Sequence, residues 1–207
     1  SVPAGNNLVE TAFHQIMRNP SRILLADSNS FLSGRDTLLR TFALASFIAR
    51  RTKDEQRVGI MLPASTAAVL CWLAVLVAGK IPVLCNWTTG AVNFTHSLTS
   101  TGLRHVLSSS RLLERLEKQG FPVQEHAPVW IALEESATEL GVLSKAGALL
   151  KSRMACIPGL GNLFIPHHVS RTAAILFTSG SEAMPKAVPL THANILANCR
   201  DIASVLN

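Results

Sequence analysis

The sequence predicts a three-layer α/β/α fold with a mostly parallel sheet, and two observations carry this prediction. Short apolar runs alternate with longer stretches of helical periodicity along most of the chain. Residues 57–62 and 81–84 are two such runs, separated by one apolar helical stretch and a Gly-Lys turn, which is the spacing of a parallel βαβ crossover. The chain has 207 residues, 48% hydrophobic and 15% charged, enough for one sizeable core.

The individual elements follow from apolar spacing and from the residues at their ends. Helices are expected at residues 8–17, 36–50, 66–78, 92–101, 111–119 and 140–150, and strands at 23–26, 57–62, 81–84, 105–107, 129–133 and 172–177. Ser33 is placed to cap the second helix, and either Ser65 or Thr66 the third. Thr191 is expected to cap a last helix that begins near His192. Residues 152–171 are expected to form a weak connector because they include a turn-rich run.

Charge and hydropathy narrow the classes of partner. The net charge is +6, but the lysines and arginines are scattered and no basic stretch is interleaved with aromatic residues, so nucleic acid is not an expected partner. The most apolar run, residues 67–78, is shorter than the roughly 20 residues of a membrane span. The low charged fraction suggests that some apolar surface meets another part of a larger protein.

No metal site is expected from the sequence. The four cysteines lie far apart without CxxC spacing, which favours a reducing, cytoplasmic compartment. His167 and His168 are adjacent, so their side chains diverge in an extended chain, and no carboxylate is nearby.

A loop rich in hydroxyl groups follows the strand at 172–177. It runs Thr-Ser-Gly-Ser from Thr178 and reaches a lysine, Lys186, eight residues later. Backbone N–H groups, hydroxyls and a compact positive charge suit a polyphosphate, although a surface turn would have a similar composition. Gly79-Lys80 does not fit the Walker pattern, residues 159–161 lack the third glycine of a dinucleotide-binding turn, and no GxSxG occurs.

Residues 175–186 resemble the phosphate-loop signature of the acyl-adenylate-forming, AMP-binding superfamily, which includes acyl-CoA synthetases, luciferases and nonribosomal peptide adenylation domains. Upstream, residues 58–63 and 72–83 are similar to the family's early strand and helix, in the same order. Glu182, together with residues 86–88 and 102–109, resembles a narrower group. That group is the acyl-acyl carrier protein synthetase half of bifunctional acylglycerophosphoethanolamine acyltransferases.

The resemblance implies that residues 1–207 are a truncated N-terminal AMP-binding region of an adenylate-forming enzyme, with the phosphate loop and following helix at 172–207. It implies ATP and Mg²⁺ as cofactors. The residues that it implies for ATP binding are Thr178, Ser179, Gly180, Ser181, Glu182 and Lys186. Lys186 is the implied catalytic residue, because it would neutralise charge on the departing pyrophosphate.

The implied reaction is that of an ATP-dependent fatty acid–thiol ligase, an acyl-CoA or acyl-acyl carrier protein synthetase, in which the fragment alone is inactive. Its implied partners are a fatty acid, coenzyme A or acyl carrier protein, and the remaining domains of the parent chain. The implied location is cytoplasmic, with peripheral membrane association of the parent protein at the cytoplasmic face of the inner membrane.

Two departures from the family pattern keep an alternative open. Ala183 and Ala187 stand where the family has glycine, and Glu182 places a carboxylate beside a polyanion. The alternative is a non-catalytic nucleotide-binding or interaction module with a degenerate phosphate loop. A nucleic-acid-binding α/β domain is a third reading, which steeply salt-dependent binding would distinguish.

Overall fold

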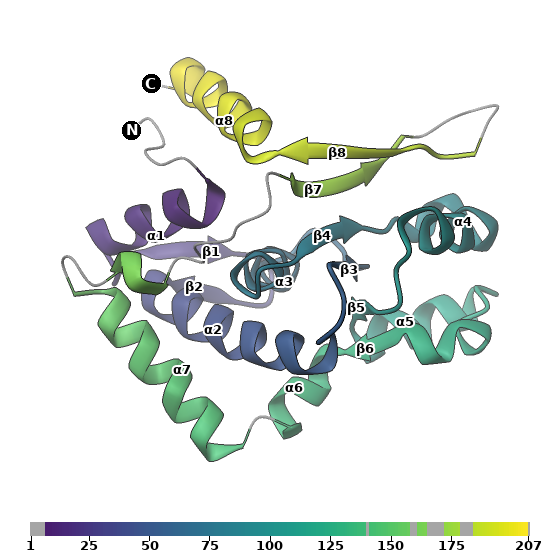
Figure 1. Ribbon diagram of the computed structural model, residues 1–207, viewed down its shortest axis with the longest axis horizontal. Helices are drawn as coiled ribbons and strands as arrows, with labels where there is room; N and C mark the ends of the chain where they lie inside the picture. Colours follow the sequence, from purple (N-terminus) through teal and green to yellow (C-terminus); the bar gives the residue numbers. More distant parts are fainter. Residues whose placement is uncertain (1–6, 140, 158–160, 165–171, 179–183, 207) are drawn as a thin grey trace.

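The structure is a computed structural model that describes residues 7–139, 141–157, 161–164, 172–178 and 184–206 (Figure 1). The α-helices are α1 (Leu8–Arg18), α2 (Gly34–Arg51), α3 (Thr66–Val77), α4 (Ala91–Thr101), α5 (Ser110–Lys118), α6 (Leu133–Glu139), α7 (Val142–Ala155) and α8 (His192–Leu206). The strands are β1 (Ile23–Ala26), β2 (Phe31–Ser33), β3 (Arg57–Ile60), β4 (Ile81–Leu84), β5 (Val106–Ser108), β6 (Trp130–Ala132), β7 (Thr172–Phe177) and β8 (Ala187–Thr191). Three short 3-10 helices are η1 (Trp87–Thr89), η2 (Gln124–Val129) and η3 (Gly161–Phe164).

Six strands form one sheet in the order β6-β5-β3-β4-β7-β8. The pairs from β6 to β7 are parallel, and only β8 runs antiparallel to its neighbour. The crossovers through α3, α4 and α5 cover both faces of the sheet, as parallel strands require. The predicted α/β class with a mostly parallel sheet is confirmed.

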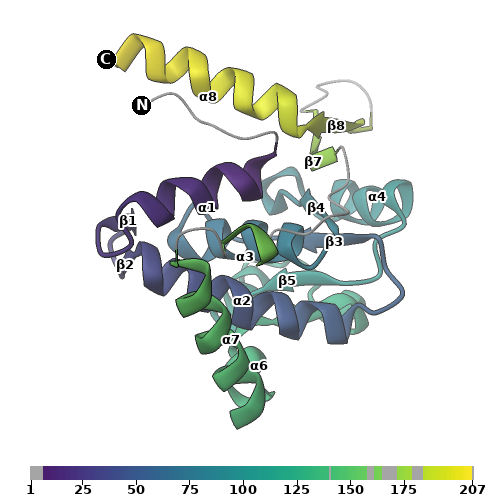
Figure 2. The ribbon, with the colours of Figure 1, turned by 60° about the vertical axis from the view of Figure 1, so that its left-hand side comes forward.

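Alternate residues of the central strands enter two separate cores. On one face, Val58 and Ile60 of β3 pack with the buried sides of α2 and α3. On the other face, Met61, which follows β3, and Val106 pack with α4 and α5. A third cluster joins α1 to α2, α7 and α8 (Figure 2). The three predicted layers are therefore present, and α7 lies outside α2 as an additional cover (Figure 1).

The caps predicted for α2, α3 and α8 are confirmed. Ser33 forms a capping box with Asp36, in which each side chain meets the other residue's backbone N–H. Ser65, and not Thr66, caps α3 by accepting from the N–H of Ala68. Thr191 Oγ1 accepts from the N–H of Asn194 in the first turn of α8.

Four features of the fold differ from the expected elements or add to them. The strand at 23–26 does not join the main sheet but pairs with β2, which the sequence did not indicate, in a small antiparallel sheet. Strand β8 and the short helix α6 were not predicted either. Helix α7 continues to Ala155, so the first residues of the expected 152–171 connector are helical. Residues 158–160 and 165–171, His167 and His168 among them, lie outside the described residues.

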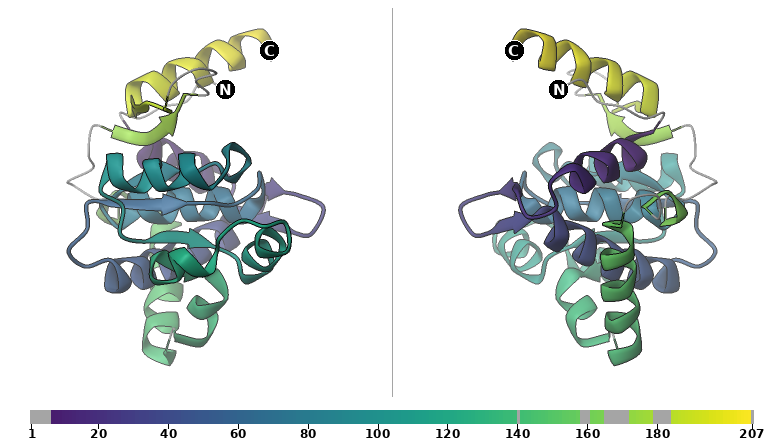
Figure 3. Two further views of the ribbon diagram at one scale, coloured as in Figure 1. Left: turned by 90° about the vertical axis from the view of Figure 1, so that its right-hand side faces the viewer. Right: turned by 90° about the vertical axis from the view of Figure 1, so that its left-hand side faces the viewer.

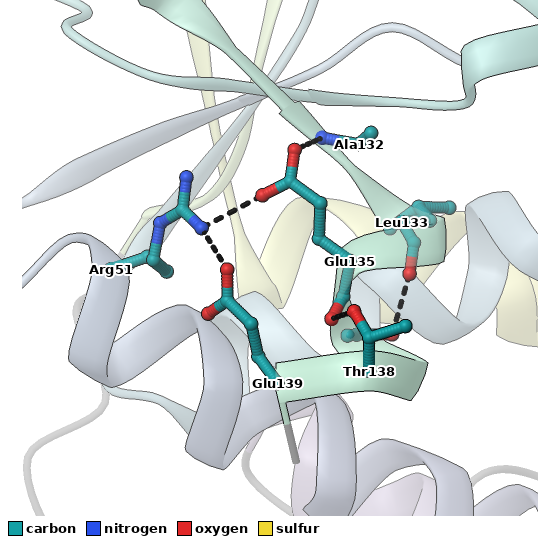
Figure 4. Close-up of polar contacts among 7 residues, drawn as sticks. Arg51, Ala132, Leu133, Glu135, Thr138 and Glu139 are labelled. Carbon is teal, nitrogen blue, oxygen red and sulfur yellow. Dashed lines mark hydrogen bonds and ion pairs between the residues drawn. The ribbon is translucent and has the colours of Figure 1, made fainter.

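Figure 4 shows how α6 is tied to the end of α2. Arg51 Nη1 lies 2.7 Å from Glu135 Oε2 and 2.5 Å from Glu139 Oε1. The other Glu135 oxygen accepts from the N–H of Ala132, at the end of β6. The ion pairs are about one-third exposed, so they position α6 more than they stabilise the fold.

Lys80 is a buried structural residue. Its ammonium group donates to the carbonyl oxygens of Thr52 and Glu55, and removal from water lowers the pKa of the amine. These contacts join the end of α2 to the start of β4. Because its ammonium group is engaged by these carbonyl oxygens, Lys80 is not placed to bind phosphate, as the sequence predicted for Gly79-Lys80.

Among the described residues, none of the helices is both long and apolar enough to cross a bilayer. The same part of the chain holds no group of three or more His, Cys, Asp or Glu side chains arranged to bind a metal ion.

Replacing Gly59 or Gly147 by alanine should change the free energy of unfolding in opposite directions. A Cβ on Gly59 would lie 2.6 Å from Val106 Cγ2, whereas one on Gly147 in α7 would meet nothing within 4 Å. We expect Gly59→Ala to destabilise the fold by about 1–3 kcal/mol through overpacking. Gly147→Ala should stabilise it by about 0.5–1 kcal/mol through helix propensity. Urea unfolding measures both, and a neutral Gly59→Ala would contradict the close β3–β5 contact.

Thiol accessibility tests the burial of the cores. Burial raises the pKa of Cys71 and Cys85 to about 12 and also raises the pKa of half-buried Cys156, while Cys199 is exposed. At pH 8 a thiol-reactive dye should label Cys199 rapidly and Cys156 more slowly. Cys71 and Cys85 should react only after unfolding. Cys199→Ser should abolish the rapid phase, and rapid labelling of all four thiols would contradict the fold.

Candidate functional site

The candidate site lies where β7 ends and the chain turns back into β8. Strand β7 pairs with β4 through Val83 and Ile175, and the indole N–H of Trp72 in α3 donates to the carbonyl oxygen of Ala173. The hairpin therefore projects from the carboxyl-terminal edge of the parallel strands (Figures 1 and 3). Ligands of open α/β sheets bind at this edge.

The base of the loop between β7 and β8 is closed by Thr178 and Lys186. The N–H of Thr178 donates to the carbonyl oxygen of Lys186 at 3.1 Å, and the N–H of Lys186 donates to Thr178 Oγ1, also at 3.1 Å. The first of these bonds extends the backbone ladder by one step beyond the last strand pair, Phe177 and Ala187, and the second adds a side-chain contact. The closure fixes the two ends of the loop relative to each other.

His96 of α4 supports the second limb of the same loop. Its Nε2 lies 3.0 Å from the carbonyl oxygen of Pro185, which is buried. A carbonyl oxygen only accepts, so Nε2 carries the proton in this contact. The residue that precedes Lys186 is thereby tied to a helix of the core.

The structure places two of the six predicted site residues. Thr178 and Lys186 are exposed neighbours, and within the described part of the chain the Lys186 ammonium group has no ion pair or hydrogen bond. Thr178 also has a closing role that the sequence did not indicate, because its hydroxyl oxygen accepts from Lys186. Ser179, Gly180, Ser181 and Glu182, with Ala183, lie outside the described residues.

A hollow of about 380 Å³ opens beside the hairpin, at the carboxyl ends of β3, β4 and β7. Polar and apolar atoms line it about equally, and the lining residues are Leu62, Leu84, Cys85, Asn86, Trp87, Leu176 and Phe177. It shares strand β7 with the loop.

Sequence reasoning missed His96 and this hollow. His96 lies in a helix 89 residues before Pro185, and nothing in its local sequence indicates the contact. Trp87 packs against the α4–α5 core and also lines the hollow.

A family model described as "AMP-binding enzyme" matches residues 12–207 of the chain. Among curated proteins, the chain is 25% identical over 201 residues to N-(5-amino-5-carboxypentanoyl)-L-cysteinyl-D-valine synthase of Streptomyces clavuligerus, covering 96% of the chain and 23% of that protein. It is 28% identical over 165 residues to medium-chain fatty-acid–CoA ligase of Escherichia coli (strain K12), covering 77% of the chain and 28% of that protein. The chain thus spans about a quarter of the length of these relatives.

A solved structure shows the same fold. The fatty acyl-adenylate ligase from L. pneumophila, in complex with acyl adenylate and pyrophosphate, superposes with a TM-score of 0.67 at 17% identity. The match covers 96% of this chain and 32% of that one. Because a family model matches nearly its whole length, the chain belongs to the AMP-binding enzyme family.

Proposed function

We propose that this chain is the N-terminal part of an ATP-dependent fatty acid–thiol ligase that forms an acyl-adenylate and releases pyrophosphate. The observation that carries the proposal is the closed base of the β7–β8 loop, which presents Thr178 and Lys186 at the carboxyl edge of the sheet. No ion pair or hydrogen bond from another described residue engages the Lys186 ammonium group. The acid is a fatty acid, and the thiol belongs to coenzyme A or an acyl carrier protein. Similarity to a fatty-acid–CoA ligase and a fatty acyl-adenylate ligase supports this choice.

In this mechanism the chain binds and positions ATP without supplying a nucleophile. The backbone and hydroxyls of Thr178, Ser179, Gly180 and Ser181 hold the β- and γ-phosphates, beside Glu182. A carboxylate oxygen of the acid attacks the α-phosphorus, and the bond to pyrophosphate breaks. Lys186 neutralises the charge that develops on pyrophosphate.

Mg²⁺ would accompany the nucleotide. The described residues offer no ready-made metal cluster, so Mg²⁺ would bind together with the nucleotide and would need few protein ligands. Bound there, Mg²⁺ would withdraw charge from the phosphates. The contribution of this chain is to keep Lys186 and the loop backbone in place through the closure at Thr178 and the contact from His96.

The rest of the parent chain is the proposed partner of the hairpin and α8. Large apolar side chains are exposed here, among them Met184 at 46%, Ile202 at 60% and Val205 at 84%. Such side chains are usually covered in an assembled protein. We therefore propose that the 207-residue chain alone is inactive. A cytoplasmic location, with peripheral association of the parent at the inner membrane, belongs to the same proposal.

ATP–pyrophosphate exchange by the full-length protein that contains this chain is the direct test. With a panel of fatty acids of different lengths, we expect exchange that depends on the acid. Lys186→Ala should lower it by about a hundredfold or more, because the charge that stabilises the departing pyrophosphate is lost. Lys151→Ala, at an exposed position of α7, is the matched control and should leave exchange unchanged.

Two results would contradict this proposal. No exchange with any acid, from folded protein, would favour the non-catalytic module with a degenerate phosphate loop. Exchange with amino acids but not with fatty acids would keep adenylate formation and overturn the fatty-acid assignment.

The closing role of Thr178 has its own test. Thr178→Val removes the oxygen that accepts from the Lys186 N–H, whereas Thr178→Ser keeps it. Loss of one such hydrogen bond should raise the KM for ATP in the exchange reaction by about two- to tenfold in the valine variant. The serine variant should stay near the wild type, and equal effects of both variants would argue against the closure.

A further inference from the structure

A second cavity, of about 500 Å³, lies at the carboxyl ends of β3, β5 and β6. Four segments line it: the turn between β1 and β2, the connection from β3 into the start of α3, the first two turns of α5 with the residue before it, and the start of α6. The lining residues are Asp27, Asn29, Ser30, Leu62, Pro63, Ser65, Thr66, Ala67, Ser109, Arg111, Leu112, Arg115 and Leu133. Its volume is in the range of small-molecule sites.

The cavity lies at a topological switch point of the sheet. Neighbouring strands β3 and β5 send their connections in opposite directions, β3 through α3 to β4 and β5 through α5 to β6. The diverging connections leave a crevice between them, which is where open α/β sheets bind ligands. The phosphate loop follows β7, two strands further from β3, so the two places are separate. Only Leu62 also lines the hollow beside the hairpin.

Two arginines give this cavity a positive rim. Arg111 and Arg115 are exposed and lie four residues apart on α5, so they stand on the same side of the helix. No ion pair or hydrogen bond joins either guanidinium group to another residue that the structure describes. Two like charges at this spacing destabilise a helix slightly, and an anion between them removes that repulsion.

The one acidic residue in the lining, Asp27, does not neutralise them. Its carboxylate accepts from the N–H groups of Asn29, Ser30 and Thr66, at 2.8–2.9 Å. These bonds hold the pKa of Asp27 well below its usual range and clamp the β1–β2 turn to the start of α3. The hydroxyls of the lining are also engaged, since Ser30 bonds to Thr66, Ser65 to Pro63 and Ser109 to Leu112.

The remainder of the lining is apolar and includes Leu62, Leu112 and Leu133. Among the described residues, the polar groups of the lining left available to a ligand are therefore the two guanidinium groups and the side-chain amide of Asn29, and of these the guanidinium groups carry charge. A ligand that satisfies both features has one anionic end and an apolar body.

We propose that this cavity binds an amphiphilic anion, an alkyl or acyl chain that ends in a carboxylate or phosphate. The anionic group lies against Arg111 and Arg115, and the chain lies against the leucines and Ala67. Binding here is independent of the phosphate loop and of the reaction proposed for it.

Isothermal titration calorimetry of the 207-residue chain tests this with decanoate, decyl phosphate, decanol and inorganic phosphate, below micelle-forming concentrations. We expect saturable one-to-one binding of decanoate, decyl phosphate or both, and the tighter of the two identifies the head group. Decanol lacks the charge and inorganic phosphate lacks the chain, so each should bind about tenfold more weakly or worse.

Variants separate this site from general surface attraction. Arg111→Gln with Arg115→Gln should weaken binding by about tenfold or more. Arg200→Gln, at an exposed arginine of α8, is the matched charge control and should leave it unchanged, as should Lys186→Ala. Ala67→Phe should fill the cavity and weaken binding, with circular dichroism as the check on folding. Absence of saturable binding, equal binding of decanol, or unchanged binding by the double variant would overturn the proposal.

Discussion

The parallel pairing of β3 with β4 and β5 is the constraint on which the rest of the structure depends. Both faces of these strands are buried, so their side chains alternate between two cores. Gly59 permits the close approach of Val106 from the neighbouring strand. Strand β7 then adds to β4, and the hairpin that carries Thr178 and Lys186 is placed by that addition. The position of the site thus depends on the packing of β3 and β4, which lie far earlier in the sequence than Thr178 and Lys186.

Much of the fold could be predicted because its strongest signals are local. The buried run at 172–177 and the βαβ unit from 57 to 84 have apolar spacing that few other structures produce. Strand β8 was not predicted, because Pro189 interrupts the apolar alternation typical of a strand and because β8 forms only by pairing with β7. The small β1–β2 sheet is exposed at Ile23 and Phe31, so burial does not mark it. Helix α6 is short and owes its position to Arg51.

The candidate site likewise has some residues that the sequence predicts and other contacts that only the folded chain creates. Thr178 and Lys186 were predictable because a hydroxyl-rich loop after a buried strand is a pattern within a dozen residues. Their mutual closure, and the contact from His96 to Pro185, depend on how β8 folds back over α4. Arg111 and Arg115 look like an ordinary solvated helix face in the sequence. They line a cavity because two connections diverge at the switch point, which the local sequence does not reveal.

Pro189 also affects how molecules of this protein meet one another. Thr178 and Lys186 exchange hydrogen bonds at the hairpin base, and antiparallel pairs alternate from there to Pro189 opposite Ile175. The proline nitrogen therefore faces the open edge of β8 and removes a donor from its middle. A strand from another molecule cannot form an unbroken ladder there, so this edge resists the intermolecular sheet growth that leads to aggregation.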